Sequence, residues 1–294
     1  MTNAIAVLMP GDMGHAVGRV LAQHGHDVLT CLDGRSERTR GLSEAAGIRD
    51  GGDLDAVIKA AALVLSILPP ASALGLAADV AGAMGRTGAK PVFVDCNAIS
   101  PATANDIAAV IAAAGAPFID AGIIGMAPDG HGPGPQFYVS GSDTGPMQAL
   151  DAMGFQVRAI GTEPGRASAL KMCYAGLTKG TWTLHTAVLL AAEGYGLSQE
   201  LRDEFEYSQA PTYAQMQAQI PGIPADSERW IGEMEEIART FVDAGLSPGF
   251  HEGAASIFRI LSKTPFASET RETIDANRTL EETIREAAKH LPDK

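Results

Sequence analysis

A short apolar run near the start of the chain constrains the fold more than any other feature. Residues 4–9 read A-I-A-V-L-M, and a helical pattern over 15–24 follows soon after them. The connection between the two is Pro10, Gly11, Asp12, Met13 and Gly14. A buried strand, a tight glycine turn and a helix N-terminus together form a place where backbone N–H groups can hold a pyrophosphate. We therefore expect the turn at 10–14 to contact a dinucleotide cofactor.

The same alternation continues through the first half of the chain. Strands and helices are predicted in turn at 28–32, 53–61, 63–68, 72–84, 92–95, 102–114 and 118–120. Apolar strands that alternate with helices predict a parallel, doubly wound sheet that is covered on both faces. Ligands of such sheets bind beyond the carboxyl ends of the strands. The loops at Gly11, Asp33, Leu68-Pro69 and Asn97 are therefore expected to surround one bound molecule.

The loop after the second strand carries charges of both signs. Asp33 lies 22 positions after Gly11, where an acidic residue usually holds a ribose 2′-hydroxyl, although an Asp in a loop also simply forms turns. The cationic residues that follow can instead bind a 2′-phosphate. The loop residues expected at the cofactor are Asp33, Gly34, Arg35 and Ser36, with Arg38 nearby. The clustered cations favour NADP as the cofactor, with NAD as the alternative.

One long helix is predicted over residues 165–194, which contain no proline and are rich in Ala and Leu. Residues at steps of 3, 4, 4 and 3 share a polar face of this helix: Lys171, Tyr174, Thr178, Trp182 and His185. The other positions are mostly apolar, which suggests a buried helix whose polar face lines a cavity. The alternative is the solvated side of a surface helix.

Length and charge limit the remaining possibilities. At 294 residues the chain predicts two domains: a dinucleotide-binding domain over 1–164, the interdomain helix over 165–194, and an all-helical substrate and dimerisation domain over 195–294. In this last part we expect helices at 199–219, 226–244, 250–262 and 268–288. The net charge of −13 disfavours nucleic acids and anionic membranes as partners and leaves small molecules.

The cysteines and the N-terminus suggest a cytoplasmic protein. Cys31, Cys96 and Cys173 have neither disulfide nor metal-ligand spacing, so no metal site is expected. The N-terminal run lacks a basic leader, and no stretch reaches about 18 apolar residues. We expect neither an export signal nor a membrane span.

Six segments resemble the β-hydroxyacid dehydrogenase superfamily, which includes 3-hydroxyisobutyrate and 6-phosphogluconate dehydrogenases and, more distantly, the imine reductases. They are P-G-D-M-G at 10–14, G-H-D-V at 25–28, L-V-L-S-I-L-P at 63–69, V-D-C-N-A-I-S-P at 94–101, F-I-D-A-G at 118–122 and G-R-A-S-A-L-K-M at 165–172. The C-terminal third resembles a subgroup with an uncharacterised C-terminal domain. The resemblance implies a Rossmann-type sheet followed by an all-helical domain, and a homodimer or larger homo-oligomer that pairs through the helical domain.

The chain departs from the superfamily pattern at several positions. Met9 stands at the first glycine of the usual turn, Ile124 at the substrate-binding serine, and Ala175 at the asparagine four residues after the family lysine. Glu235-Glu236 align near a second anion-binding Lys-Asp pair. A small dianionic substrate is therefore disfavoured, and an apolar, aromatic or weakly charged hydroxy or keto compound fits better.

The family lysine is present as Lys171, and it is the candidate acid/base residue. Partial desolvation beside a cofactor lowers the pKa of such an amine toward a useful range. Tyr174, one turn later, can relay the proton or can simply be a core residue. The residues expected at the substrate are Gly122, Ile123, Ile124, Thr178 and Trp182.

These residues predict an NAD(P)-dependent oxidoreductase that interconverts a hydroxy compound, hydroxyacid-like or more apolar, and its carbonyl by hydride transfer. An imine (C=N) reductase is the alternative, because D-A-G-I-I-G-M-A-P at 120–128 and Y-V-S-G at 138–141 resemble those enzymes. They usually lack a lysine at the position of Lys171, which argues against this alternative. A non-catalytic dinucleotide-binding protein is the second alternative, given Met9 and Ala175.

Overall fold

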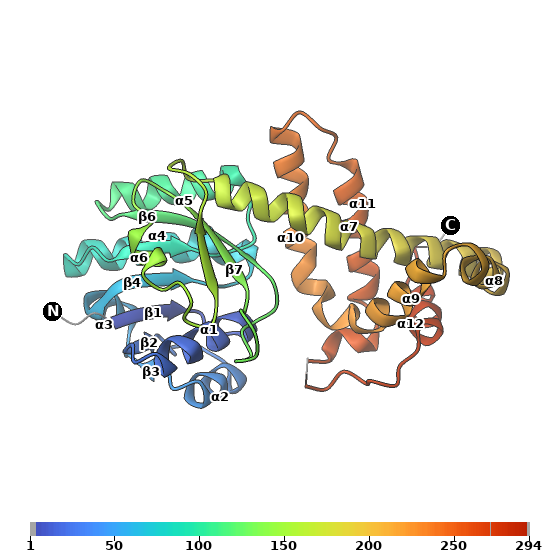
Figure 1. The fold of residues 1–294 in the computed structure, drawn as a ribbon, viewed down its shortest axis with the longest axis horizontal. Coiled ribbons are helices and arrows are strands. Elements are labelled where there is room, and N and C mark those ends of the chain that lie inside the picture. Colours follow the sequence, from blue (N-terminus) through green and yellow to red (C-terminus); the bar gives the residue numbers. More distant parts are fainter. Residues whose placement is uncertain (1–3, 271, 293–294) are drawn as a thin grey trace. The chain divides into compact units, whose positions relative to one another are not determined.

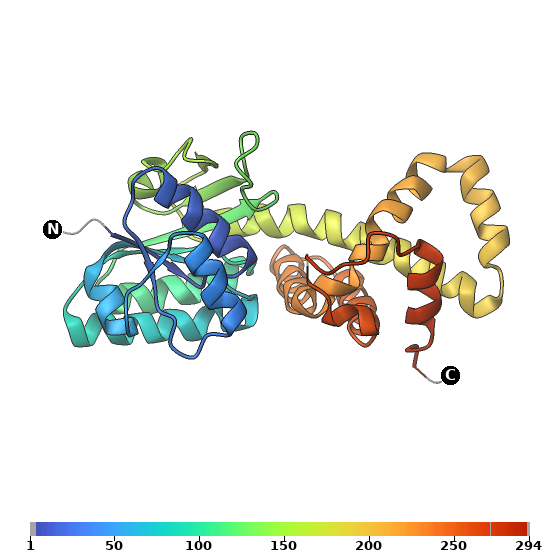
Figure 2. The same ribbon diagram turned by 90° about the horizontal axis from the view of Figure 1, so that it is seen from below.

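The computed structural model describes residues 4–270 and 272–292, and the chain divides into two units, residues 1–172 and 173–294 (Figures 1 and 2). The boundary falls inside helix α7 (Arg166–Tyr195), which corresponds to the long helix predicted over 165–194. The first unit contains the sheet, and the second is helical.

The sheet unit is built on one eight-stranded sheet in the order β3-β2-β1-β4-β5-β6-β7-β8. The strands are β1 (Ala4–Leu8), β2 (Val28–Thr30), β3 (Arg49–Asp50), β4 (Ala61–Ser66), β5 (Val92–Asp95), β6 (Phe118–Ile124), β7 (Gln136–Ser140) and β8 (Gln156–Ala159). Strands β1 to β6 are parallel to one another. From β1 the chain adds β2 and β3 on one side and then β4, β5 and β6 on the other, so the direction of strand order reverses between β1 and β4. This reversal is the position at which doubly wound sheets bind their ligands.

The far edge of the sheet differs from the expectation of a purely parallel sheet. Strand β7 runs antiparallel to β6, and β8 pairs with β7 in parallel. Strand β6 also continues four residues beyond Asp120, because Ala121–Ile124 pair with β7. The sequence pattern missed β3, β7 and β8 because these strands are short or alternate in polarity and lie among glycines and prolines.

Alternate residues of the strands face two separate hydrophobic cores. Ile5 and Val7 pack with α1 on one face, whereas Ala6 and Leu8 pack with α3, α4 and α5 on the other. The helices of this unit are α1 (Asp12–Gln23), α2 (Glu37–Ala45), α3 (Leu54–Ala60), α4 (Ala73–Thr87), α5 (Pro101–Ala113) and α6 (Gly145–Gln148). The prediction of a sheet covered on both faces is confirmed (Figures 1 and 2).

The second unit consists of the rest of α7 and five further α-helices. These are α8 (Ser198–Ser208), α9 (Ala210–Gln219), α10 (Pro224–Asp243), α11 (Gly249–Leu261) and α12 (Leu280–Ala288). The described residues also form three short 3-10 helices: Pro70–Ser72 in the sheet unit, and Ile220–Gly222 and Pro265–Ser268 in the helical unit. Among the described residues, none of these helices combines the length and apolar character that crossing a membrane requires.

Two helix predictions in this unit are wrong. The helix expected over 199–219 is interrupted at Gln209, because Pro211 starts a new helix there. The helix expected over 268–288 is limited to α12 within the described residues. Thr279 starts α12 with a capping box, in which Thr279 Oγ1 accepts from the Glu282 N–H and Glu282 accepts from the Thr279 N–H.

Helix α7 presents a row of large apolar side chains that the described residues of this chain cover only in part. Leu170, Tyr174, Leu177, Leu184 and Val188 are 38%, 49%, 71%, 51% and 37% exposed. Their spacing of 4, 3, 7 and 4 residues follows a seven-residue repeat, and we call this row the α7 seam. The expectation that the apolar positions of this helix are buried holds for Met172, Ala175 and Leu190 but not for the α7 seam.

Candidate active site

The turn between β1 and α1 is shaped by two glycines with different tasks. A methyl group added at Gly14 would lie 2.2 Å from the carbonyl oxygen of Met9, so α1 can pack against the turn only without a side chain there. A methyl group at Gly11 would meet nothing within 4 Å. Gly11 is also the N-cap of α1, and no side chain caps this helix. The first-turn N–H groups of α1 therefore face an approach that is open to an anion.

The loop after β2 and the first turn of α2 each place an arginine beside this turn. The Arg35 guanidinium contacts the sulfur of Met9, and Arg38 Nη2 donates to Asp12 Oδ1 at 2.6 Å. Ser36 caps α2 by accepting from the Thr39 N–H at 3.2 Å. Asp33 and Gly34 are exposed. The structure thus brings the predicted cationic residues beside the turn at 10–14.

A row of buried polar side chains crosses the sheet at the carboxyl ends of the parallel strands. Ser66, Asp95, Asp120 and Ser140 are register partners on β4, β5, β6 and β7, and each is 0% exposed. We call these four residues the polar row. Sequence reasoning did not identify it, because its members are 29, 25 and 20 residues apart and only strand register aligns them.

Asn97 connects the polar row to the loop after β4. Its Nδ2 donates to Ser66 Oγ at 2.9 Å and to Asp95 Oδ2 at 2.8 Å, while its Oδ1 accepts from the Leu68 N–H at 2.7 Å. The Asn97 side chain is only 3% exposed, and its hydrogen bond from the Leu68 N–H holds the Leu68-Pro69 loop in place. Burial raises the pKa of Asp95 to about 7, the hydrogen bonds from Asn97 act in the opposite direction, and the nearby Asp120 carboxylate raises the pKa further.

Lys171 lies on the first turns of α7, against strand β6. A methyl group added at Gly122 would be 2.9 Å from Lys171 Cβ and 2.7 Å from the carbonyl oxygen of Ala167. Gly122 therefore permits α7 to lie against the strand, and Lys171 is half-buried there. Ile124 is also half-buried, but Ile123 is 6% exposed and belongs to the core. The Ile123 side chain points into the core because neighbouring strand residues alternate between faces, and its place at the substrate stays a prediction.

The other predicted residues of α7 belong to the helical unit. Tyr174 is half-exposed in the α7 seam, and Thr178 donates to backbone carbonyls of its own helix at 3.2 and 3.3 Å. Trp182 stacks on Trp230 with ring centroids 5.3 Å apart. Trp182 therefore has a packing role within this unit. Burial lowers the pKa of His185 on the same helix.

A buried ion pair that sequence reasoning missed lies beside these tryptophans. Lys179 Nζ is 2.8 Å from Glu233 Oε1 and 5.2 Å from the centre of the Trp230 ring. Lys179 lies eight residues after Lys171, which is about 80° further round the helix, so the polar face drawn through Lys171 did not include it. A carboxylate already neutralises its charge, which makes it part of the packing.

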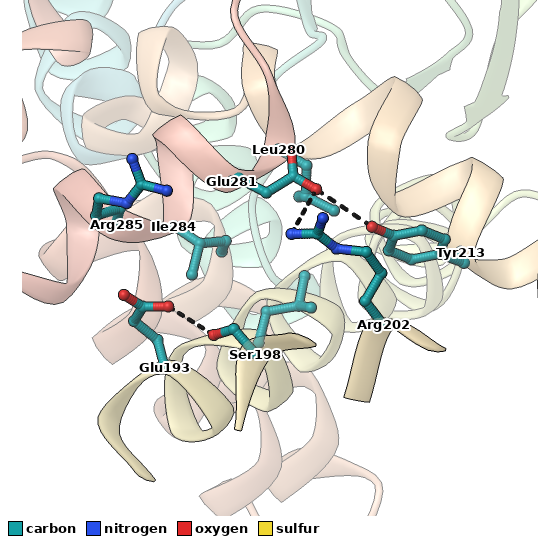
Figure 3. Close-up of a pocket in the computed structure, with 9 residues that line it drawn as sticks. Glu193, Ser198, Arg202, Tyr213, Leu280, Glu281, Ile284 and Arg285 are labelled. Atoms are coloured by element: carbon teal, nitrogen blue, oxygen red, sulfur yellow. Dashed lines mark hydrogen bonds and ion pairs between the residues drawn. The ribbon is translucent and has the colours of Figure 1, made fainter. Parts of the chain in front are cut away.

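The helical unit also contains a cavity of about 70 Å³ between α7, α8, α9 and α12 (Figure 3). The polar residues that line it pair largely with one another: Arg202 forms an ion pair with Glu281 at 3.1 Å, and the Tyr213 hydroxyl donates to Glu281 at 3.3 Å. Burial and the Glu281 carboxylate raise the pKa of Tyr213. None of the residues predicted at the substrate lines this cavity.

No group of three or more His, Cys, Asp or Glu residues within the described ranges is arranged to hold a metal ion.

Residues 4–161 match the family model described as the NAD binding domain of 6-phosphogluconate dehydrogenase. The chain belongs to this family. Residues 192–261 match a domain of unknown function, DUF1932. The resemblance drawn from the sequence motifs is confirmed, and so is the fold class of a Rossmann-type sheet followed by helices.

Relatives and solved structures agree with the family assignment. An uncharacterised 28.5 kDa protein of Methanothermus fervidus is 29% identical over 76% of this chain and 84% of its own length. A 3-hydroxyisobutyrate dehydrogenase of Pseudomonas aeruginosa is 30% identical over 58% of this chain and 57% of its own length. The structure of Mycobacterium tuberculosis 3-hydroxyisobutyrate dehydrogenase with L-serine superposes with a TM-score of 0.64, at 19% identity over 97% of this chain and 99% of that chain. An Aspergillus terreus reductive aminase shares the fold with a TM-score of 0.55, at 17% identity over 87% and 93%.

Proposed function

We propose that this protein is an NADP-dependent oxidoreductase that interconverts an apolar or weakly charged hydroxy compound and its carbonyl, with Lys171 as the acid/base residue. The observation that carries the proposal is the packing of Lys171 Cβ against Gly122 on strand β6, whose parallel neighbour β5 ends at Asp95, just before Asn97. The 3-hydroxyisobutyrate dehydrogenase among the relatives supports the reaction class.

The residues of the β1–α1 turn fit a dinucleotide. The open approach at Gly11 and the uncapped N-terminus of α1 suit a pyrophosphate, and the strand order reverses at this position. Arg35, on the loop after β2, contacts Met9, and Arg38, in the first turn of α2, is paired with Asp12, so a 2′-phosphate would bind beside Arg35 and compete with Asp12 for Arg38. This arrangement supports NADP over NAD.

The bound nicotinamide would donate or accept the hydride. Lys171 would protonate the oxygen of the carbonyl during reduction and accept the hydroxyl proton during oxidation. The apolar side chain of Ile124, on the same strand face as Gly122, would favour a substrate without a second anionic group. We also retain Tyr174 as a residue that can share the proton and Thr178 as a residue near the substrate, and Tyr174→Phe tests the first of these roles.

The test is the Lys171→Met variant, with Lys90→Met as the control because Lys90 is an exposed lysine elsewhere in the sheet unit. Reduction of cyclohexanone and ethyl levulinate and oxidation of 3-hydroxyisobutyrate are followed by NADPH absorbance. Lys171→Met is expected to lose 10²-fold or more in kcat, since general acid/base groups contribute about 10² to 10⁴-fold, while its NADPH affinity is retained. Full activity of Lys171→Met would refute the assignment.

The cofactor preference has its own test. Arg35→Ala and Arg38→Ala should each weaken NADPH binding by about tenfold or more, because a hydrogen bond to a charged group contributes about 1.5–3 kcal/mol, and should leave NADH binding nearly unchanged. Arg86→Ala is the matched control, because Arg86 pairs with Asp55 between α3 and α4. Equal losses for both cofactors would contradict a 2′-phosphate role.

Imine reduction is the second candidate, and the shared fold with a reductive aminase favours testing it. Cyclohexanone is supplied with and without allylamine, and the products are separated. Amine formation that survives in Lys171→Met would identify C=N chemistry. Tight NADPH binding without turnover of any compound would instead identify a binding protein.

We further propose a homodimer that covers the α7 seam. A seven-residue repeat of apolar side chains over 19 residues is the pattern by which two helices pair. Light scattering during gel filtration measures the mass directly, and a monomer at all concentrations would contradict the proposal.

A further inference from the structure

Helix α7 begins without a capping side chain of its own. Gly165 is its N-cap, since the Gly165 carbonyl oxygen accepts the first helical hydrogen bond, from the Ala169 N–H, at 2.9 Å. Glycine offers no side-chain oxygen to the free N–H groups of the first turn. Ala167 and Ser168 are both 0% exposed, so water cannot satisfy these groups. The acceptor must come from another part of the fold.

Asp120 of the polar row supplies this acceptor from strand β6. Its Oδ2 accepts from the Ala167 N–H at 2.9 Å and the Ser168 N–H at 3.1 Å, and its Oδ1 accepts from Ser168 Oγ at 2.6 Å. Ser140 Oγ donates a further hydrogen bond to Oδ2 at 2.9 Å. These four donors and the positive end of the helix compensate the carboxylate for its complete burial.

Because of the residue spacing along β6 and α7, this cap sets the position of Lys171 along the strand. Gly122 lies two residues after Asp120, which is about 6.6 Å along a strand, and Lys171 lies four residues after Ala167, which is about 6 Å along a helix. The two advances are nearly equal, so capping Ala167 at Asp120 brings Lys171 level with Gly122. The 2.9 Å approach of Lys171 Cβ to a methyl group built at Gly122 agrees with this geometry.

We infer that Asp120 is a positioning residue, which fixes the height and rotation of α7 on β6 and thereby the position of the Lys171 amine. This inference rests on the proposed function for the meaning of that position. Asp120 itself is enclosed by Ser140, Ala167 and Ser168, so it acts through the helix. Ser140 and Ser168 share the task because each holds one edge of the carboxylate.

The test observes Lys171 directly, so it does not depend on knowing the substrate. The chain has only seven lysines, and reductive methylation with ¹³C-formaldehyde gives each amine an NMR signal. The signal that is missing in Lys171→Met identifies Lys171. In Asp120→Ala we expect the Lys171 signal to move away from its wild-type position. Asp53→Ala, which removes the carboxylate cap of α3, should leave the Lys171 signal as in the wild type.

A kinetic cycle gives the second readout. Asp120→Ala should lower kcat on the order of 10²-fold with NADPH affinity retained, as expected for a displaced catalytic group, and should have no further effect in the Lys171→Met background. Asp120→Asn keeps one acceptor oxygen for the helix N–H groups, so it should recover part of both the NMR signal and kcat. If Asp120→Ala does not fold, Asp120→Asn takes its place in both measurements.

The outcomes separate the two proposals. An unchanged Lys171 signal in the folded Asp120 variant would overturn the positioning role, whether or not Lys171 is catalytic. An equal loss of kcat in the wild-type and Lys171→Met backgrounds would also overturn it. Full activity of Lys171→Met would instead overturn the acid/base assignment. A displaced Lys171 signal in Asp120→Ala would then still support the positioning of α7 by Asp120.

Discussion

Asp95 should make the stability of the sheet unit depend on pH, and Asp95→Asn should remove that dependence. Asp95 is completely buried beside Asp120, and burial raises its pKa from an ordinary 3.8 to about 7. The folded protein therefore holds the proton more tightly than the unfolded chain. The stabilisation is complete below about pH 4 and is lost as the pH rises to 7.

The shift corresponds to about 4 kcal/mol between pH 4 and pH 8, at 1.36 kcal/mol per pKa unit. An Asn side chain stays neutral, but its Nδ2 would face Asn97 Nδ2, which now donates to Asp95 Oδ2 at 2.8 Å. Losing this bond costs about 1–3 kcal/mol. The variant should therefore be less stable than the wild type at pH 4 and more stable at pH 8.

Urea unfolding at several pH values, followed by far-ultraviolet circular dichroism, measures the effect. Both tryptophans, Trp182 and Trp230, belong to the helical unit, so their fluorescence reports that unit separately. Asp27→Asn, an exposed carboxylate in the sheet unit, is the control and should run parallel to the wild type. Wild-type and Asp95→Asn curves that stay parallel from pH 5 to pH 8 would refute the reasoning.

Three further substitutions test other contacts. Gly14→Ala introduces a methyl group 2.2 Å from the Met9 carbonyl oxygen, so α1 must move; urea unfolding should show a loss of about 1–3 kcal/mol, and nicotinamide fluorescence should show weaker NADPH binding. Trp182→Ala removes the stacking on Trp230 and should destabilise the helical unit by up to about 3 kcal/mol in urea, with unchanged NADPH affinity. Leu177→Glu changes a side chain that is 71% exposed, so it should leave the circular dichroism spectrum intact but produce monomers in light scattering.

Much of the sheet unit could be predicted from local pattern. The apolar runs of β1, β4 and β5 are buried on both faces, and such runs between helices have few alternative packings. The glycine turn at 10–14 carries its own signal, because Gly14 is required by one close contact with Met9. The prediction failed where neighbours along the chain do not determine the outcome, as in β7, whose direction depends on its pairing with β6.

The sequence suggested candidate residues for the site but not the hydrogen bonds that join them. Lys171 and Asn97 could be selected from motifs, but the sequence did not reveal that Asn97 is buried and holds the Leu68-Pro69 loop or that Asp120 caps α7. Both facts depend on strand register, which brings distant residues into one row. The sequence also did not reveal that Leu177 is exposed, because an apolar residue in a helix can pack against its own chain or against another copy, and the pattern is the same in both cases.

The α7 seam links assembly to chemistry along a single helix. Leu170 and Tyr174 of the seam flank Lys171 in the sequence, so whatever covers the seam also restrains the turn that holds the amine. If two copies cover it, activity per chain should fall when the protein is diluted below the point at which dimers separate, and should return on concentration. Initial rates across a dilution series would reveal this, and the concentration of chains would then act as a control on turnover.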